Sequence, residues 1–175
     1  MKYNPDLHHR KSIRLKNYDY SQNGVYFITI CTKNRRCLFG TIDNNEMALN
    51  TLGIIVRDEW IKSFQIRKEL EMDEYVIMPN HFHDIVSISY RNSSFYFSQS
   101  TQSKGMQNKS ISSLMAGFKS SVASKINALQ KQSSESIWQR NYHEHVIRNE
   151  AALQKIREYT RNNPLTWQND SLFEK

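Results

Sequence analysis

The sequence predicts an α+β fold, a ferredoxin-like (RRM-like) sandwich in which helices pack mainly on one face of an antiparallel sheet. Short apolar runs rich in β-branched and aromatic residues alternate with longer runs of helical spacing. In chain order these runs read strand, strand, helix, strand, strand, helix, strand, helix, which favours helices packed against a sheet. The chain has 175 residues and no internal repeat, so we expect one domain with a hydrophobic core.

The first part of the chain predicts strands joined by polar turns. Residues 24–32 are apolar on both faces and rich in β-branched and aromatic residues, which indicates a central strand. The basic turn at 33–36 leads to a short returning strand at 37–40, which would complete a hairpin. Residues 46–49 add another short strand.

A helix and two further strands follow. Asn50 or Thr51 caps a helix that runs to about Phe64, because apolar residues recur there at helical spacing. Residues 70–78 and 82–89 are expected to be two strands joined by a Pro-Asn step. Proline cannot donate a hydrogen bond to a strand ladder, so Pro79 marks the boundary between them.

The second half of the chain begins with a loop and ends with a helix. Residues 91–110 are rich in Ser, Gln and Asn, which predicts a flexible loop inserted within the domain. Apolar residues recur at three- and four-residue steps over 111–131, which predicts an amphipathic helix. Residues 137–148 are expected to be extended. A last helix covers about 150–162, and the following Pro164 sets its end.

The composition indicates a soluble protein with a polyanionic partner. The formal net charge is +7 and the pI is about 9.4, which favours nucleic acid, although soluble basic proteins are common. Cys31 and Cys37 form no C-x-x-C motif, which predicts reduced thiols in the cytoplasm. There is no apolar signal core, and no apolar run approaches the ~20 residues of a transmembrane helix. We therefore expect no membrane partner.

The chemistry is expected to centre on the histidine pair His81 and His83. In an extended strand successive side chains point to opposite faces, so the two histidines share one face and Phe82 points to the other. Two imidazoles on one rigid strand can both reach a divalent ion. The pair alone is weak support for a metal site, because two half-exposed histidines near a strand end give the same pattern.

The last predicted helix carries Tyr159 and, four residues later, Asn163. Residues at this spacing are neighbours on a helix surface, if the last turn holds. Asn163 can supply an oxygen ligand to an ion at the two histidines, and open positions on the ion can bind a phosphodiester. Tyr159 can then attack in line, although a phenol with a pKa near ~10 must first lose its proton. Spacing alone favours the interpretation of Tyr159 as an ordinary core tyrosine, because it borders Ile156.

Several runs along the chain carry a more specific pattern. They are HHRKSIRL at 8–15, YFITICT at 26–32, VIMPNHFH at 76–83, WQRNY at 138–142, and HVIRNE at 145–150 continuing through Tyr159 to NNPL at 162–165. With these runs the chain resembles the single-tyrosine HUH transposases, and specifically the REP-associated tyrosine transposases of bacteria. The resemblance spans nearly the whole chain except the loop at 91–110.

The resemblance implies a single HUH transposase domain over residues 1–175. It implies a single-stranded DNA endonuclease and strand transferase that depends on Mg²⁺ or Mn²⁺ and acts on hairpin-bearing DNA. His81 and His83 match the family's metal-binding histidines, Asn163 matches a third ligand, and Tyr159 matches the nucleophile. Cleavage in the family leaves a covalent 5′-phosphotyrosine and a free 3′-hydroxyl.

The resemblance also bears on assembly and location. Relatives that mobilise insertion sequences are dimers and REP-associated members can be monomers, so either a monomer or a homodimer is expected. The expected location is the bacterial cytoplasm, on the nucleoid when the protein binds DNA.

Basic and aromatic residues outside the site are candidates for DNA contacts. The candidates are Arg10, Lys11, Arg14, Arg35, Arg36, Arg140, Tyr142 and Arg148. Tyr142 is also a rival nucleophile. His143 and His145 form a second possible metal pair, which we interpret as surface or supporting residues. Lys119 and Lys125 lie off the apolar stripe of their predicted helix, available to solvent or to phosphates.

Asp84 departs from the family, which usually has glycine directly after the second histidine. On a regular strand Asp84 faces the Phe82 side, where a carboxylate is costly to bury. If the strand bends, Asp84 becomes an extra ligand or crowds the DNA. The alternative function is therefore a catalytically inactive, domesticated protein that binds single-stranded nucleic acid. A zinc hydrolase is the third alternative, with no third histidine or carboxylate at an obvious ligand spacing.

Overall fold

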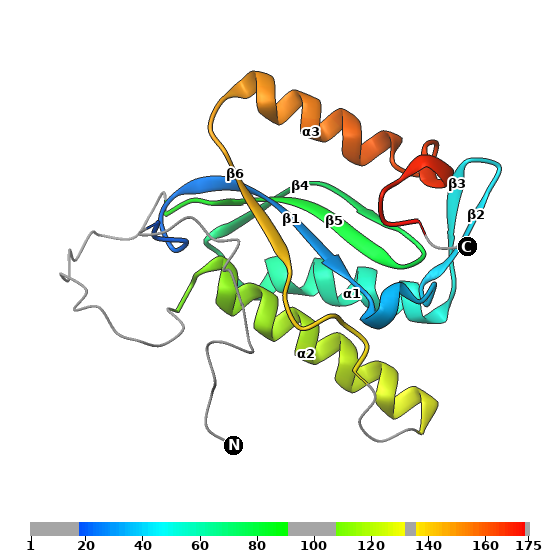
Figure 1. Cartoon of the computed structure of the whole chain (residues 1–175). Coiled ribbons are helices and arrows are strands. Elements are labelled where there is room, and N and C mark those ends of the chain that lie inside the picture. The colour runs from blue at the N-terminus through cyan, green and yellow to red at the C-terminus, as the bar shows by residue number, and fades with distance from the viewer. Residues whose placement is uncertain (1–17, 91–107, 132–135, 174–175) are drawn as a thin grey trace, which may run out of the picture.

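The structure, a computed structural model, describes residues 18–90, 108–131 and 136–173 (Figure 1). The predicted loop lies mostly outside the described residues, as do the candidate DNA contacts Arg10, Lys11 and Arg14. The strands are β1 (Gly24–Cys31), β2 (Gly40–Asp43), β3 (Glu46–Leu49), β4 (Leu70–Ile77), β5 (His81–Ile88) and β6 (His143–Ile147). The α-helices are α1 (Thr51–Ile66), α2 (Ile111–Gln130) and α3 (Glu150–Asn162).

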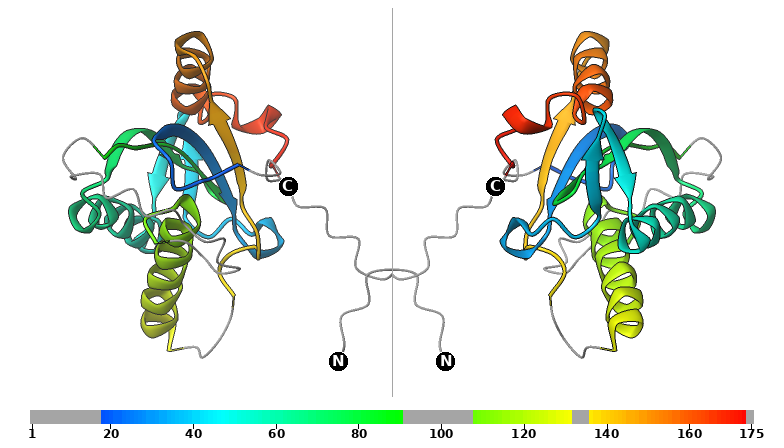
Figure 2. Two further views of the ribbon diagram at one scale, coloured as in Figure 1. Left: turned by 90° about the vertical axis from the view of Figure 1, so that its left-hand side faces the viewer. Right: turned by 90° about the vertical axis from the view of Figure 1, so that its right-hand side faces the viewer.

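The main sheet has the strand order β4-β5-β1-β6, with antiparallel pairing throughout. Without the β2–β3 hairpin, the order β1-α1-β4-β5-α2-β6 is that of a ferredoxin-like fold. Helices α1 and α2 cover one face of the sheet, and α3 lies across the opposite face (Figures 1 and 2). The α+β prediction is confirmed, with two of its three helices on one face.

The hydrophobic core lies between the sheet and helices α1 and α2. Phe82 of β5 points into it and packs against Trp60 of α1 and Phe118 of α2, with ring centroids 5.1 Å and 5.7 Å away. Aromatic pairs at these separations contribute beyond their buried area. The opposite face of the same strand is therefore left for α3 and the candidate site.

The prediction of a strand at residues 37–40 is wrong. Gly40 begins β2, which pairs with β3 in a separate two-stranded sheet. The residues before it are held elsewhere, because the backbone amides of Leu38 and Phe39 both donate to the carbonyl oxygen of Pro79, at 2.8 Å and 3.1 Å. The hairpin turn has positive φ at Asn44 and Asn45, as a tight type I′ turn requires.

The helix starts follow the capping chemistry that the sequence predicts. The Asn50 side chain accepts hydrogen bonds from the backbone amides of Leu52 and Gly53 at the start of α1. Asn149 accepts from Ala152 at the start of α3. The predicted ranges of all three helices agree with the structure to within two residues.

Helix α3 is fixed to the sheet by ion pairs at a bulge in β4. The register of β4 against β5 shifts between Met72 and Tyr75, and the bulge presents Asp73 and Glu74. Arg157 binds Asp73 with two parallel hydrogen bonds, Nε to Oδ1 at 2.9 Å and Nη2 to Oδ2 at 2.6 Å. Arg161 donates to Glu74 at 2.8 Å. These pairs, one turn apart, orient the helix that carries Tyr159.

Two lysines of α2, predicted to be available to solvent or to phosphates, make contacts within the protein. Lys119 donates to backbone carbonyl oxygens of the segment before β6. Lys125 pairs with buried Glu59 of α1, with nitrogen and oxygen 2.5 Å apart. In the part of the chain that the structure describes, no helix combines the length and apolarity needed to cross a membrane.

Candidate active site

The register of the sheet collects the candidate residues on the face below α3. Residues paired across antiparallel strands point to the same face, and His83 of β5 pairs with Thr29 of β1. His81 and His83 are both buried, with ring centroids 4.5 Å apart. From α3, the hydroxyl of Tyr159 lies 3.1 Å from Nε2 of His83. The predicted histidine pair and tyrosine thus come together.

The side chain of Asn80 determines how His81 is oriented. Its amide nitrogen donates to the carbonyl oxygen of Leu172 at 2.8 Å, so its amide oxygen faces Nδ1 of His81, also at 2.8 Å. His81 therefore carries its proton on Nδ1 and keeps a lone pair on Nε2. Within the described residues this buried Nε2 has no hydrogen-bond partner. An imidazole held this way is prepared to bind a metal ion.

His83 is held in a comparable way by β1. Its Nδ1 lies 2.8 Å from the hydroxyl oxygen of Thr29, and its ring stacks on Phe27 with centroids 5.2 Å apart. When Nδ1 donates to Thr29, Nε2 accepts from the Tyr159 hydroxyl. The candidate metal-ligating nitrogen and the phenol therefore face each other.

Burial keeps both histidines neutral. It lowers the pKa of His81 to about 4 and that of His83 well below the ordinary value. A nearby negative charge on Asp170 opposes the shift at His81 without cancelling it. Neutral imidazole is the form that binds metals, so the environment favours ligation at physiological pH.

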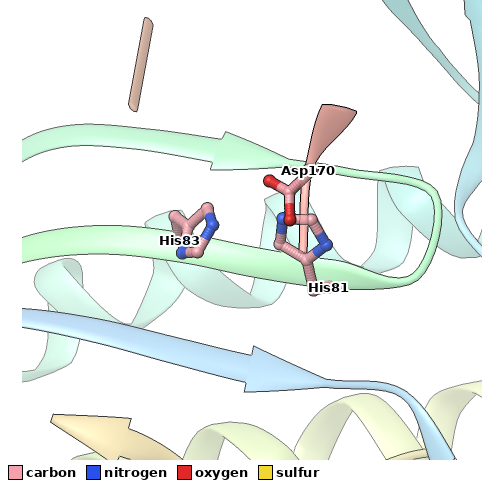
Figure 3. Close-up of side chains that lie close together, drawn as sticks. All are labelled: His81, His83 and Asp170. Atoms are coloured by element: carbon pink, nitrogen blue, oxygen red, sulfur yellow. The ribbon is translucent and has the colours of Figure 1, made fainter. Parts of the chain in front are cut away.

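A third candidate ligand, Asp170, was missed from the sequence. Figure 3 shows its carboxylate beside the two histidines of β5. Ligand atoms of His81, His83 and Asp170 all lie within 4.8 Å of one another. Asp170 stands at no ligand spacing from the histidines in the sequence, so only the fold brings this carboxylate to them. The missed signal was Trp167, an apolar residue in a polar tail, whose ring lies 5.7 Å from His81 and holds this segment against the site.

Asn163 also reaches the site from the end of α3. Its amide nitrogen donates to Oδ2 of Asp170 at 2.9 Å. Its amide oxygen is buried and, among the described residues, has no hydrogen-bond partner. The site thus leaves two buried acceptors unsatisfied, Nε2 of His81 and Oδ1 of Asn163. Such orphans are rare in folded proteins, and a divalent ion would satisfy both.

Tyr159 is the accessible member of the site. It exposes 43% of its surface, whereas the histidines and Asn163 are buried. Partial burial raises the pKa of Tyr159 to about 12, and the nearby carboxylate of Asp170 adds to the shift. The phenol is therefore protonated at neutral pH, and its activation needs a positive charge or a base close by.

A cleft of about 500 Å³ opens beside Tyr159. It runs from the two catalytic candidates His83 and Tyr159 to the segment before β6. Its lining comprises Phe27, Thr29, Cys31, His83, Gln139, Asn141, Tyr142, His143, Tyr159, Ser171 and Leu172. A substrate that fills this cleft would contact both His83 and Tyr159.

The chain is similar to known proteins in sequence and in fold. It is 41% identical to an uncharacterised protein of Haemophilus influenzae, over 98% of this chain and 97% of that protein. The chain belongs to the same family as that protein. No protein-family model matches the chain.

A solved structure extends the comparison to the fold. It is a REP-associated tyrosine transposase bound to a REP hairpin, with a TM-score of 0.61 and 21% identity. The similarity covers 88% of this chain and 74% of that one. This chain therefore has the fold of a REP-associated tyrosine transposase, as its sequence motifs led us to expect.

The other predicted DNA contacts fall in several places. Tyr142 and His143 line the cleft, and His145 is exposed further along the same face of β6. Arg35 donates to the carbonyl oxygen of Ser171 at 3.2 Å and so contacts the segment that carries Asp170. The predicted contacts Arg36, Arg140 and Arg148 have exposed side chains. Contact of these residues with DNA stays a prediction.

Asp84 lies on the opposite face of β5, as expected for a regular strand. Its pairing with Ile28 and Tyr75 directs it away from the histidines, and it is fully buried. Burial raises the pKa of its carboxyl well above the ordinary value. In this position Asp84 neither joins the ligand set nor crowds the cleft, so its effect falls on folding stability.

Proposed function

We propose that the protein is a metal-dependent single-stranded DNA endonuclease and strand transferase that acts through a covalent 5′-phosphotyrosine on Tyr159. The observation that carries the proposal is the contact between the Tyr159 hydroxyl and His83, 3.1 Å apart, at the mouth of a cleft. The net charge of +7 suits a nucleic-acid substrate. The structurally similar transposase is bound to a REP hairpin, which supports hairpin-bearing DNA as the substrate class.

His81, His83 and Asp170 would hold the metal ion, with Asn163 as a further oxygen ligand. The mixture of imidazole nitrogen, carboxylate and amide oxygen suits Mn²⁺ or Mg²⁺. When bound, the ion would neutralise charge on the phosphate and make the phenol easier to ionise. Asn80 and Thr29 support this ligand set through the Nδ1 atoms of the two histidines.

Tyr159 carries out the bond exchange. Its phenolic oxygen attacks the phosphorus, the bond from phosphorus to the 3′ oxygen breaks, and the 5′ phosphate stays on the tyrosine. Asp170, whose Oδ2 lies 3.5 Å from the phenolic oxygen, is placed to accept the phenolic proton. The departing 3′ oxygen takes a proton from water. One phosphodiester replaces another, so the 3′-hydroxyl of a second strand can reverse the step and join the two DNAs.

The ion pairs of α3 hold Tyr159 in a fixed position relative to the histidines. Arg157 and Arg161 hold the helix to the bulge of β4 on either side of Tyr159. Tyr159 itself packs edge-on against Phe27 and His83, with centroids 6.1 Å and 5.2 Å away. Positioning of this kind is a major source of rate in phosphoryl transfer.

The function is tested by incubating the protein with Mn²⁺ and single-stranded hairpin DNA drawn from the flanks of its gene. Each DNA is labelled separately at its 3′ and 5′ ends and run on a denaturing gel. We expect a slow protein–DNA band that carries only the 3′ label, while the 5′ label appears in a shorter free fragment. EDTA should abolish both. Clear binding on a native gel without any adduct or cleavage would instead support the inactive nucleic-acid-binding protein.

We expect Asn80→Ala to weaken Mn²⁺ affinity by roughly 10–100-fold, the usual cost of removing a hydrogen-bond partner of a metal-ligating histidine. The substitution frees Nδ1 of His81 and releases the Leu172 carbonyl, so both His81 and the Asp170 segment lose orientation. Isothermal titration with Mn²⁺ measures the effect. Asn162→Ala, at an exposed position of α3, is the matched control and should bind Mn²⁺ as the wild type does. Equal affinities for all three proteins would contradict the role of Asn80.

A further inference from the structure

The turn that follows β1 holds two residues in an uncommon backbone conformation. Asn34 and Arg35 have φ angles of 56° and 49°, which residues other than glycine rarely adopt. Such a conformation persists only where the surrounding contacts fix it. Here the contacts come from the buried Thr32, whose hydroxyl oxygen lies 2.8 Å from the carbonyl oxygen of Arg36 and 3.0 Å from that of Asn80. The side chain of Arg35 therefore starts from a fixed position.

The guanidinium of Arg35 contacts the segment that carries Asp170. Its Nη1 donates to the carbonyl oxygen of Ser171 at 3.2 Å. The next carbonyl oxygen, that of Leu172, accepts from the side-chain amide of Asn80 at 2.8 Å. Two successive carbonyl groups directly after Asp170 are thus each bound by a donor from a distant part of the chain. The carboxylate beside the histidines depends on this support, because the segment that carries it is irregular.

The charge of Arg35 opposes a cation at the site, whereas its hydrogen bond favours one. Burial is the main cause of the low pKa of His81, and the positive charge of Arg35 lowers this pKa further, so the guanidinium acts on the metal site. A like charge nearby weakens the binding of a metal ion. The hydrogen bond to Ser171 has the opposite effect, since it fixes the backbone next to a candidate ligand. Position and charge therefore predict changes of opposite sign when Arg35 is removed.

We propose that Arg35 is a positioning residue, which holds Asp170 where it can bind the metal ion of the histidine pair. It acts through the carbonyl group of Ser171. This role rests on the proposed function, because it takes Asp170 as a metal ligand. It also differs from the DNA contact that the charge of Arg35 suggests in the sequence.

Isothermal titration with Mn²⁺ tests the effect on the metal site. We expect Arg35→Ala to weaken Mn²⁺ affinity by about 10-fold, the lower end of the range for residues that orient metal ligands. Loss of the charge alone would instead tighten binding. Lys33→Ala removes an exposed cation from the same turn and is the matched control, which should not weaken Mn²⁺ binding.

A second background shows whether Arg35 acts through the carboxylate. Asp170→Ala removes the candidate ligand that Arg35 is proposed to position. In this background the further change Arg35→Ala should not weaken Mn²⁺ binding again, because two residues that act as one unit are not additive. A second loss of about 10-fold in the double variant would show that Arg35 acts elsewhere, and would overturn the proposal.

Hydrogen exchange of the metal-free protein tests the support itself. The backbone amides of Asp170, Leu172 and Phe173 all donate hydrogen bonds within their own segment. In Arg35→Ala, peptides that cover this segment should exchange at least about 3-fold faster, because a locally opened segment loses protection. Peptides from α1 should exchange as in the wild type.

Three results would overturn the proposal. They are unchanged exchange in Arg35→Ala, Mn²⁺ affinity in this variant that equals or exceeds that of the wild type, and weaker hairpin binding in EDTA with exchange unchanged. The last result would make Arg35 a phosphate contact. A wild-type protein that binds no Mn²⁺ would instead count against the proposed function, and it is recognised separately because the exchange measurement needs neither metal nor DNA.

Discussion

Tyr159→Phe should abolish the covalent adduct, with a loss of at least about 10³-fold in its rate of formation, because no other group can replace the attacking oxygen. The phenylalanine ring keeps the packing against Phe27 and His83 and loses only the hydroxyl. Hairpin binding should therefore stay close to that of the wild type. The initial rate of adduct formation with Mn²⁺ and an end-labelled hairpin is the measurement, and a native gel reports binding.

Tyr142→Phe is the matched control for this loss. Tyr142 lines the same cleft and was the rival nucleophile in the sequence. Tyr142 belongs to the segment before β6, whereas Tyr159 of α3 contacts His83 directly through its hydroxyl. Tyr142→Phe should therefore keep the adduct. An adduct that persists in Tyr159→Phe and disappears in Tyr142→Phe would show that Tyr142 is the nucleophile and would contradict the role of Tyr159.

Asp84→Asn should stabilise the protein at pH 8 by roughly 1–3 kcal/mol, the scale of an unfavourable buried polar group. Asp84 is fully buried, and neither carboxyl oxygen has a hydrogen-bond partner among the described residues. Burial therefore penalises the ionised carboxylate, and the uncharged amide of asparagine avoids this cost with nearly the same shape. Urea unfolding of both proteins at several pH values measures the difference.

The pH dependence of this difference has a definite sign. Burial raises the pKa of Asp84 in the folded state, whereas the unfolded chain titrates near its ordinary value of about 3.9. Above that value the unfolded state binds fewer protons than the folded state, so the free energy of unfolding falls as pH rises. The advantage of asparagine should therefore grow from pH 4 to pH 8. The buried histidines have the opposite trend below pH 6.5, but both proteins share it and it cancels.

A second aspartate provides the control for Asp84. Asp43→Asn changes an exposed carboxyl of the β2–β3 hairpin and should shift stability by no more than about 0.5 kcal/mol at any pH. Asp84→Asn should also leave adduct formation unchanged, because the side chain points away from the site. A variant that is less stable than the wild type at pH 8, or a difference that does not vary with pH, would show that burial does not raise the pKa of Asp84.

Rules that depend only on neighbouring residues, such as strand alternation and helix capping, predicted much of the fold and part of the site. Strand alternation placed His81 and His83 on one face and Asp84 on the other, as the structure shows. Side-chain caps at Asn50 and Asn149 set the helix starts. The resemblance to a known family pointed to Tyr159 and Asn163, which spacing alone left as ordinary helix residues.

The features that were missed depend on contacts between distant segments. Asp170 joins the histidines only because an irregular segment after α3 folds back, held by Trp167 and by the contact between Asn80 and Leu172. No spacing rule connects these positions. The residues before β2 have a strand-like composition, but the Pro79 carbonyl binds their amides and removes them from the sheet. Competition of this kind is decided by tertiary contacts, which override local propensity.

The most direct test of the central claim is to locate the bond between protein and DNA. After reaction with Mn²⁺ and hairpin DNA, the DNA is digested by nucleases and the protein by a protease, and the modified peptide is sequenced by mass spectrometry. Our account predicts a nucleotide joined through its 5′ phosphate to the oxygen of Tyr159. A phosphotyrosine at Tyr142, or metal-dependent cleavage that leaves the protein unmodified, would contradict it.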